Sequence, residues 1–204
     1  MNSKFLIAVA LLSLSGCTTT STPDASTRDA SMSPDSPGPM FDPALCRPTV
    51  VQPDFVSQGA MGESIPGTVW FGPAVNPATG QPTIPPGSLV ATTYLQLRID
   101  PASQMTFGDV AGRVFGALFA SPGLIAVATV ASNQCAAART LTVWESEEAM
   151  MGFVTSAAHA EAMARVGEMS RGGSVTTTFM ANASGDVSWA EVVRRFEGHT
   201  GPIY

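Results

Sequence analysis

Apolar and polar residues alternate along residues 88–100, the most regular stretch of the chain. Leu89, Leu95 and Leu97 recur on one side, whereas Tyr94 and Arg98 recur on the other. A period of two is typical of a β-strand with one apolar face. We therefore predict a strand here, and Pro101 predicts its end because proline cannot donate a ladder hydrogen bond.

A helical pattern follows this strand. Thr106 is followed three residues later by Asp109, which is the spacing of a capping box, and Met105 and Val110 can form the hydrophobic staple around it. The pattern predicts a helix that begins at Thr106 and ends at the Ser-Pro-Gly sequence of residues 121–123.

Shorter patterns complete the folded part. They predict two strands, a long helix with a break at Ser156, a threonine-rich strand and a last helix, over residues 124–130, 139–144, 146–171, 174–180 and 188–196. The order βαββαβ followed by a C-terminal helix is that of the ferredoxin-like motif. We therefore predict an α+β, two-layer sandwich over residues 88–198, with a tail at 199–204.

The N-terminal half has a different composition. Residues 43–87 contain Phe55 and Trp70 but are interrupted repeatedly by Pro and Gly. This predicts an irregular extension that packs on the domain, with one short strand near Trp70. Residues 17–42 are mostly Ser, Thr, Pro, Asp and Gly, so they have little to bury and are predicted to be a disordered tether.

The first residues have the order of a secretory signal. Lys4 precedes an apolar run over residues 5–14, and Leu14-Ser15-Gly16-Cys17 follows. The run is too short to cross a bilayer core of roughly 30 Å. The four residues ending at Cys17 resemble the bacterial lipobox, which implies a signal peptide of residues 1–16 and acylation of Cys17. Thr18 in place of Asp favours the outer membrane within the cell envelope.

The net charge and the cysteines limit the binding partners and the covalent links that the chain is expected to have. The chain has a formal net charge of −6, and Lys4 is its only lysine. An acidic protein is not expected to bind nucleic acid, or an anionic membrane by charge alone, so the membrane partner is reached through the lipid. Cys46 and Cys135 are either one disulfide, which an exported compartment permits, or two separate thiols.

The segment from Thr142 to Met163 reads Thr-Val-Trp-Glu-Ser-Glu-Glu-Ala-Met-Met-Gly-Phe-Val-Thr-Ser-Ala-Ala-His-Ala-Glu-Ala-Met. Its order of aromatic, Glu, Ser, Glu, Ala, Phe, Ser and His resembles the strand-to-helix signature of the antibiotic-biosynthesis-monooxygenase-like superfamily. Members of that superfamily pair two ferredoxin-like sheets into a dimeric α/β barrel. The resemblance therefore implies a homodimer.

The resemblance leaves the chemistry open, because the superfamily includes cofactor-free and haem-using oxygenases. Its haem-degrading members carry a Trp in the middle of this helix and a His further along. At those positions this chain has Phe153 and Met163, so haem degradation of that type is not expected. No cofactor is predicted, and haem bound through His159 is the alternative.

If two sheets pair, their polar faces would line a pocket suited to a planar organic ligand. The predicted ligand-binding residues are Trp144, Thr142 and Thr178, and the predicted catalytic residues are His159, Arg98 and Tyr94. His159 could act as a general base, and Arg98 could bind a carboxylate or enolate. The alternatives are a solvated or dimer-facing sheet surface, a structural histidine and an arginine paired across the sheet.

Other chemical signatures are lacking: the sequence contains no phosphate loop, no Gly-x-Ser-x-Gly elbow and no clustered metal ligands. Two functions remain. One is a non-catalytic, membrane-anchored lipoprotein that binds a small organic ligand or serves a surface role. The other is a monooxygenase-like oxidoreductase acting on a small aromatic or polyketide-like substrate.

Overall fold

The computed structural model describes residues 41–58, 64–65, 68–199 and 203. The predicted signal peptide, Cys17 and most of the predicted tether lie outside these residues. The elements of the described chain are, in order, β1 Val56–Gln58, β2 Ser64–Ile65, β3 Trp70–Phe71, β4 Ser88–Gln96, α1 Pro101–Ala120, β5 Leu124–Ser132, β6 Ala137–Trp144, α2 Glu147–Val154, α3 Ala157–Ala164, α4 Val166–Met169, β7 Val175–Ala181, η1 Ser184–Asp186 and α5 Trp189–Arg195.

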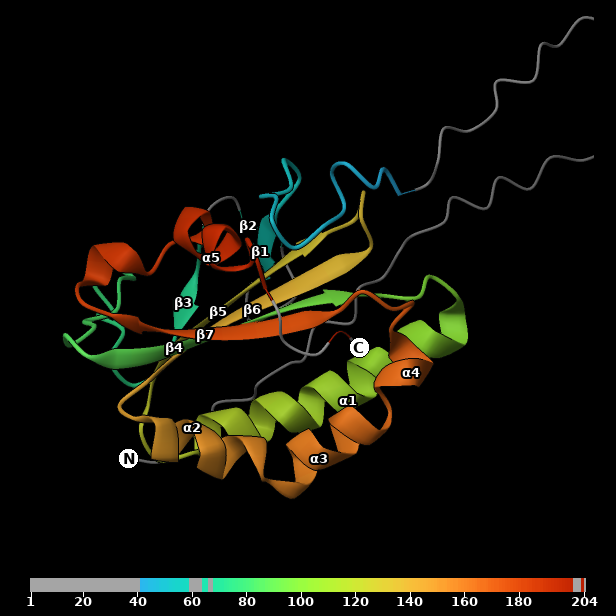
Figure 1. Ribbon diagram of the computed structural model, residues 1–204. Coiled ribbons are helices and arrows are strands. Elements are labelled where there is room, and N and C mark those ends of the chain that lie inside the picture. The colour runs from blue at the N-terminus through green and yellow to red at the C-terminus, as the bar shows by residue number, and fades with distance from the viewer. Residues whose placement is uncertain (1–40, 59–63, 66–67, 200–202, 204) are drawn as a thin grey trace, which may run out of the picture.

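One antiparallel sheet forms the centre of the fold (Figure 1). Its strand order is β2-β1-β5-β6-β4-β7, and β3 also pairs with β5. The four strands β5-β6-β4-β7, with α1 and α2–α4 as connections, have the order of the ferredoxin-like motif. The α+β fold and the additional C-terminal helix agree with the prediction.

The start of α1 differs from the prediction. The strand β4 ends at Gln96, because the Leu97 N–H bonds the Ala136 carbonyl at 2.7 Å and the Arg98 N–H bonds the Met169 carbonyl at 2.8 Å. The helix then begins at Pro101, and the Asp100 carboxylate accepts from the Ser103 N–H at 2.9 Å. The predicted start at Thr106 is therefore wrong: proline at the first helical position favours a helix rather than only ending a strand.

This cap can be tested by substitution. We expect Asp100→Ala to lower the urea midpoint of unfolding, because the first turn of α1 loses its side-chain acceptor. Thr106→Ala, within the helix, is the matched control and should leave the midpoint nearly unchanged. Equal effects of the two substitutions, measured by circular dichroism, would contradict the assignment.

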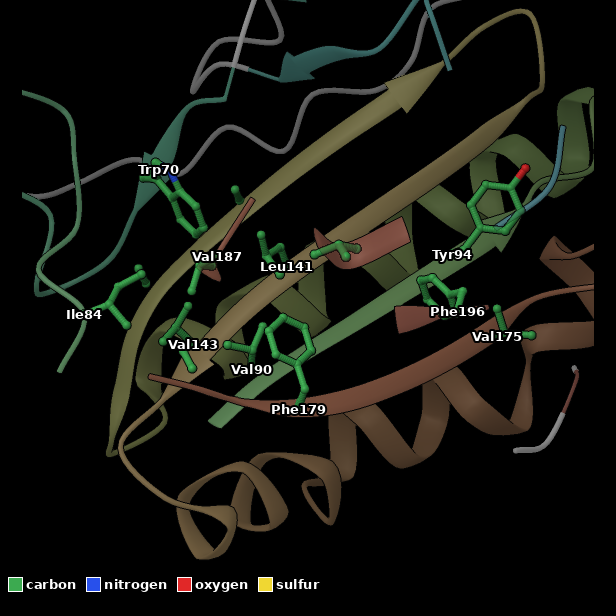
Figure 2. Close-up of a cluster of buried hydrophobic side chains, with 14 of the residues drawn as sticks. Trp70, Ile84, Val90, Tyr94, Leu141, Val143, Val175, Phe179, Val187 and Phe196 are labelled. Atoms are coloured by element: carbon green, nitrogen blue, oxygen red, sulfur yellow. The ribbon is translucent and has the colours of Figure 1, made fainter. Parts of the chain in front are cut away.

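The two sides of the sheet are buried by different parts of the chain. We call the side that carries Leu89, Val127 and Trp144 the helix-facing side, because Leu118 and Phe153 of the helices pack against it. We call the other side, which carries Val90, Tyr94 and Leu141, the covered side. The extension and the C-terminal segment cover it with Phe41, Leu45, Cys46, Trp70, Ile84, Val187, Trp189, Val192 and Phe196. Figure 2 shows four of these residues, Trp70, Ile84, Val187 and Phe196, around Val90 and Leu141 of the sheet.

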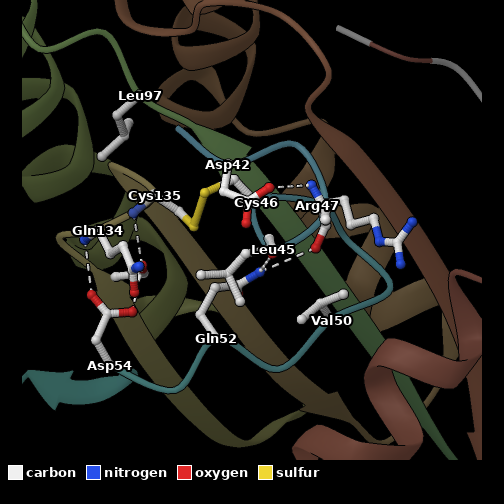
Figure 3. Close-up of a disulfide and its surroundings, with 12 residues drawn as sticks. Asp42, Leu45, Cys46, Arg47, Val50, Gln52, Asp54, Leu97, Gln134 and Cys135 are labelled. Carbon is white, nitrogen blue, oxygen red and sulfur yellow. Dashed lines mark hydrogen bonds between the residues drawn. A yellow bond between two sulfur atoms is a disulfide. The ribbon is translucent and has the colours of Figure 1, made fainter. Parts of the chain in front are cut away.

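The extension is attached to the domain at several points (Figure 3). Cys46 and Cys135 form a disulfide, which is one of the two states that the sequence left open. The Asp54 carboxylate accepts from the Ser132 hydroxyl at 2.7 Å and from the Gln134 N–H at 2.8 Å. These contacts join residues far apart in the chain, so they depend on the tertiary fold.

Candidate functional site

The strand register divides the predicted site residues between the two sides of the sheet. Ala91 of β4 lies opposite Thr142 of β6 and Thr178 of β7, so these residues share the helix-facing side with Trp144. Tyr94 lies opposite Arg139 and belongs to the covered side. The structure therefore does not bring Tyr94 together with the predicted ligand-binding residues.

On the helix-facing side, aromatic residues connect the sheet to the helices. The Trp144 indole is fully buried, and its Nε1–H donates to the Thr142 hydroxyl at 2.9 Å. Phe153 of α2 stacks on Trp144 with ring centroids 5.6 Å apart, and His159 of α3 meets the Phe153 ring edge-on at 5.1 Å. We call Trp144, Phe153 and His159 the aromatic ladder.

Local sequence signals place the two helical members of this ladder. Ser146 caps α2 by accepting from the Ala149 N–H, and Ser156 caps α3 by accepting from the His159 N–H. The second cap ends the first helix and restarts it in a new direction. Because of this break, His159 lies beside Phe153, six residues earlier in the chain.

On the same side of the sheet as the ladder, a row of threonines on β7 remains open to solvent. Thr176 and Thr178 of β7 point to the helix-facing side and are exposed, and Met180 of the same strand is 50% exposed. The Thr93 and Thr176 hydroxyls form a hydrogen bond of 3.0 Å. The helices therefore bury the β5–β6 half of this side and leave the β7 half accessible.

The environment of His159 favours its neutral form. Burial lowers the pKa of the imidazole, and a hydrogen bond to the Val154 backbone carbonyl opposes that change. A neutral imidazole can accept a proton or a hydrogen bond from a ligand.

This shift predicts a pH dependence of stability. Because the pKa of His159 is lower in the folded chain, its contribution is complete above the unfolded pKa of about 6.5 and decreases as the pH falls towards the folded value. We expect the unfolding midpoint to decrease as the pH falls below about 6.5, and His159→Gln to flatten that decrease. An unchanged slope in His159→Gln would contradict the shift, and His199→Gln is the matched control.

Two predicted catalytic residues lie elsewhere. Tyr94 is fully buried on the covered side, where burial raises the pKa of its hydroxyl. Arg98 lies beyond the end of β4, is exposed, and donates from Nε to the Ser170 carbonyl at 3.0 Å. Neither residue contacts the aromatic ladder.

The sequence prediction missed Arg139, the most deeply buried charged residue of the described chain. It lies in β6 on the same side as Leu141 and Val143, with the guanidinium carbon 4.5 Å from the centre of the Tyr94 ring. Along β6, Arg139 alternates with Leu141 and Val143 at every second residue, so all three point to the same side of the strand. That alternation was the sequence signal that could have identified Arg139 as buried.

The residues at the ladder do not fit the haem-degrading arrangement. Phe153 is held in the stack on Trp144, and Met163 of α3 is 37% exposed. Within the part of the chain that the structure describes, no three His, Cys, Asp or Glu side chains are grouped in a way that could hold a metal ion. None of its helices is both long and apolar enough to cross a membrane.

Comparisons with known proteins found distant structural likenesses only. No family model and no curated protein matches the sequence. A putative monooxygenase from Lactobacillus acidophilus is 13% identical with a TM-score of 0.40, and the match covers 47% of this chain and 46% of that one. Rv0793 from Mycobacterium tuberculosis is 14% identical with a TM-score of 0.42, over 46% and 94% of the two chains.

A third similar structure is SnoaB, a cofactor-independent oxygenase from Streptomyces nogalater. It is 14% identical with a TM-score of 0.39, and the match covers 47% of this chain and 93% of that one. The match with the Lactobacillus acidophilus protein covers 46% of that protein, so this chain spans about half of its length.

Proposed function

We propose that this protein is a lipoprotein, held on a membrane of the cell envelope through acylated Cys17, and that its domain binds a small organic ligand without oxidising it. The observation that carries the binding proposal is that the aromatic ladder and the open threonine row lie on the same side of the sheet. Aromatic surface with a few placed polar groups is typical of small-molecule sites. The exposed Thr176 and Thr178 and the His159 imidazole supply those polar groups here, while the predicted ligand-binding residue Thr142 is buried and bonded to Trp144 and to the Ala91 carbonyl.

The arrangement favours binding over catalysis. The oxygenase alternative needs Tyr94, Arg98 and His159 in one pocket, whereas Tyr94 lies on the opposite side of the sheet from Trp144. Arg98 is engaged with the Ser170 carbonyl. His159 is then the one predicted catalytic residue left at the ladder, which suits recognition better than a proton-transfer relay.

The homodimer stays a prediction, and its interface would have to lie away from the covered side. The extension and α5 bury that side with their own apolar residues, including Trp70, Val192 and Phe196. A second sheet could pair face to face there only if these segments were displaced. Light scattering of the mature chain will report its mass in solution.

A ligand-stabilisation screen tests the binding proposal. We expect a planar quinone or aromatic compound at 100 times its Kd to stabilise the mature chain by about 2.7 kcal/mol. Thr178→Arg should abolish the gain by filling the open row, whereas Asn133→Arg adds the same charge at an exposed turn and should preserve it. Gains that are equal in both variants would contradict the proposed site.

The other parts of the proposal have their own measurements. A compound identified in the screen, incubated with protein and air, should be recovered unchanged, whereas an oxidised product would establish the oxygenase alternative. Cys17→Ser should move the protein from the membrane fraction to the soluble fraction and remove labelling by a fatty acid. Retention of Cys17→Ser in the membrane would contradict lipid anchoring.

A further inference from the structure

Arg139 is buried completely between the sheet and the segments that cover it. Its guanidinium lies over three aromatic rings, at 4.5 Å from the centre of Tyr94, 5.4 Å from Phe55 and 5.7 Å from Phe196. The extension thus closes over the charged group, and an aromatic cage surrounds it on several sides.

The hydrogen bonds of this guanidinium are unevenly distributed. Nη2 donates to the backbone carbonyls of Pro48 at 2.7 Å, Val50 at 2.9 Å and Arg47 at 3.3 Å. Nε and Nη1 are buried and have no hydrogen-bond partner among the described residues. The Nη2 end of the guanidinium is therefore fully hydrogen-bonded, whereas the edge that carries Nε and Nη1 has no acceptor.

The charge of Arg139 is also unbalanced. No carboxylate of the described chain forms an ion pair with it: the ion pairs found there use Arg113, Arg165, Arg194 and Arg195. Burial lowers the pKa of Arg139 only to about 10, so the group is cationic at neutral pH. A second cation, Arg171, lies near enough to act on Tyr94 from the same region.

The unpaired N–H groups of Arg139 need hydrogen-bond acceptors. Nε and Nη1 carry three N–H hydrogens, and the buried Tyr94 hydroxyl also lacks a partner. Two other side-chain atoms of the described residues are buried without a partner. They are His199 Nε2 and Gln52 Oε1, and the Gln52 amide Nε2 already donates to the Leu45 and Arg47 carbonyls. A water molecule could accept from the guanidinium but carries no charge, whereas an anion accepts several hydrogen bonds and also compensates the buried positive charge.

We propose that the folded protein encloses a small monovalent anion, of about the size of chloride, against the unpaired edge of the Arg139 guanidinium. The ion would balance the buried charge and accept at least one of the free N–H groups. It would be taken up as the extension closes over the sheet, because the disulfide and the Arg139–carbonyl bonds then hold the cover in place. The site lies on the opposite side of the sheet from the aromatic ladder, so it is independent of the proposed ligand.

Diffraction from crystals of the mature chain grown in sodium bromide locates the ion directly. We expect an anomalous bromine peak beside Arg139 and inside the extension. If bromine peaks appear only at exposed arginines, the result is an adventitious ion only and overturns the proposal. An ordered water beside Arg139 with no anomalous signal would overturn it as well. This measurement uses the unmodified chain and does not depend on whether a variant folds.

Unfolding measurements after refolding in defined salts give an independent readout. Above the Kd, each tenfold rise in chloride should lower the unfolding equilibrium constant about tenfold relative to sodium gluconate of equal ionic strength. Gluconate is too large to be enclosed. Arg139→Met should abolish the difference between the two salts, and the exposed Arg98→Met should preserve it. Equal stability of the unmodified chain in chloride and gluconate would overturn the proposal.

Discussion

Removal of the Cys46–Cys135 disulfide is expected to lower the free energy of unfolding by about 4–5 kcal/mol. The bridge closes a loop between residues 89 positions apart. A cross-link over such a distance removes many conformations from the unfolded chain, and the loss of that restriction is the main effect of breaking it. Both cysteines are buried, so alanine is the suitable replacement because it buries no hydroxyl.

The measurement is urea denaturation of the Cys46→Ala/Cys135→Ala double variant. Dithiothreitol should destabilise the unmodified chain by a similar amount and leave the double variant unaffected. The double variant thus serves as the control for effects of dithiothreitol other than reduction of this disulfide. The folded state should persist, because Arg139 and Asp54 still attach the extension to the sheet. A loss below about 1 kcal/mol would show that the unfolded chain is restricted in some other way.

Truncation of Trp144 is expected to have an effect of comparable size. Trp144→Ala should cost about 3–5 kcal/mol, since the indole is fully buried between the sheet and α2 and its removal leaves a cavity. Phe153 would lose its stacking partner at the same time. The position of α2 and the start of α3 depend on that contact, so His159 should also become more accessible.

Trp144→Phe separates packing from hydrogen bonding at this position. It retains a ring for Phe153 to stack on and loses the donor to the Thr142 hydroxyl. That hydroxyl still donates to the Ala91 carbonyl, so we expect less than half of the loss seen in Trp144→Ala. Equal losses in the two variants, measured by chemical denaturation, would show that the hydrogen bond rather than the packing dominates.

Local signals predicted most of the helices and strands. The helix starts at residues 146 and 188 and the break at Ser156 could be predicted from the sequence, because each of these serines accepts from the N–H three residues later in the same segment. The start of α1 was misread because two local signals competed. Asp100 with Pro101 defines the start in the structure, whereas Thr106 with Asp109 had the same spacing within the helix.

The candidate site was predicted less well, because it depends on register. Alternation shows that Tyr94 and Leu95 point to opposite sides of β4, but it does not show which residues of β6 share each side. A change of one residue in pairing moves a whole strand to the other side. The observed pairs, Tyr94 with Arg139 and Ala91 with Thr142, therefore separate residues that the sequence placed in one pocket.

The sequence by itself determined the α+β element order, the caps and the resemblance at residues 142–163, since each depends on neighbours along the chain. Only the tertiary structure decided what lies on each side of the sheet. Burial of Arg139 under Pro48 and Val50, and contact of His159 with Phe153, require segments to be brought together by the hydrophobic packing of the whole domain. No pattern within a single element contains that information.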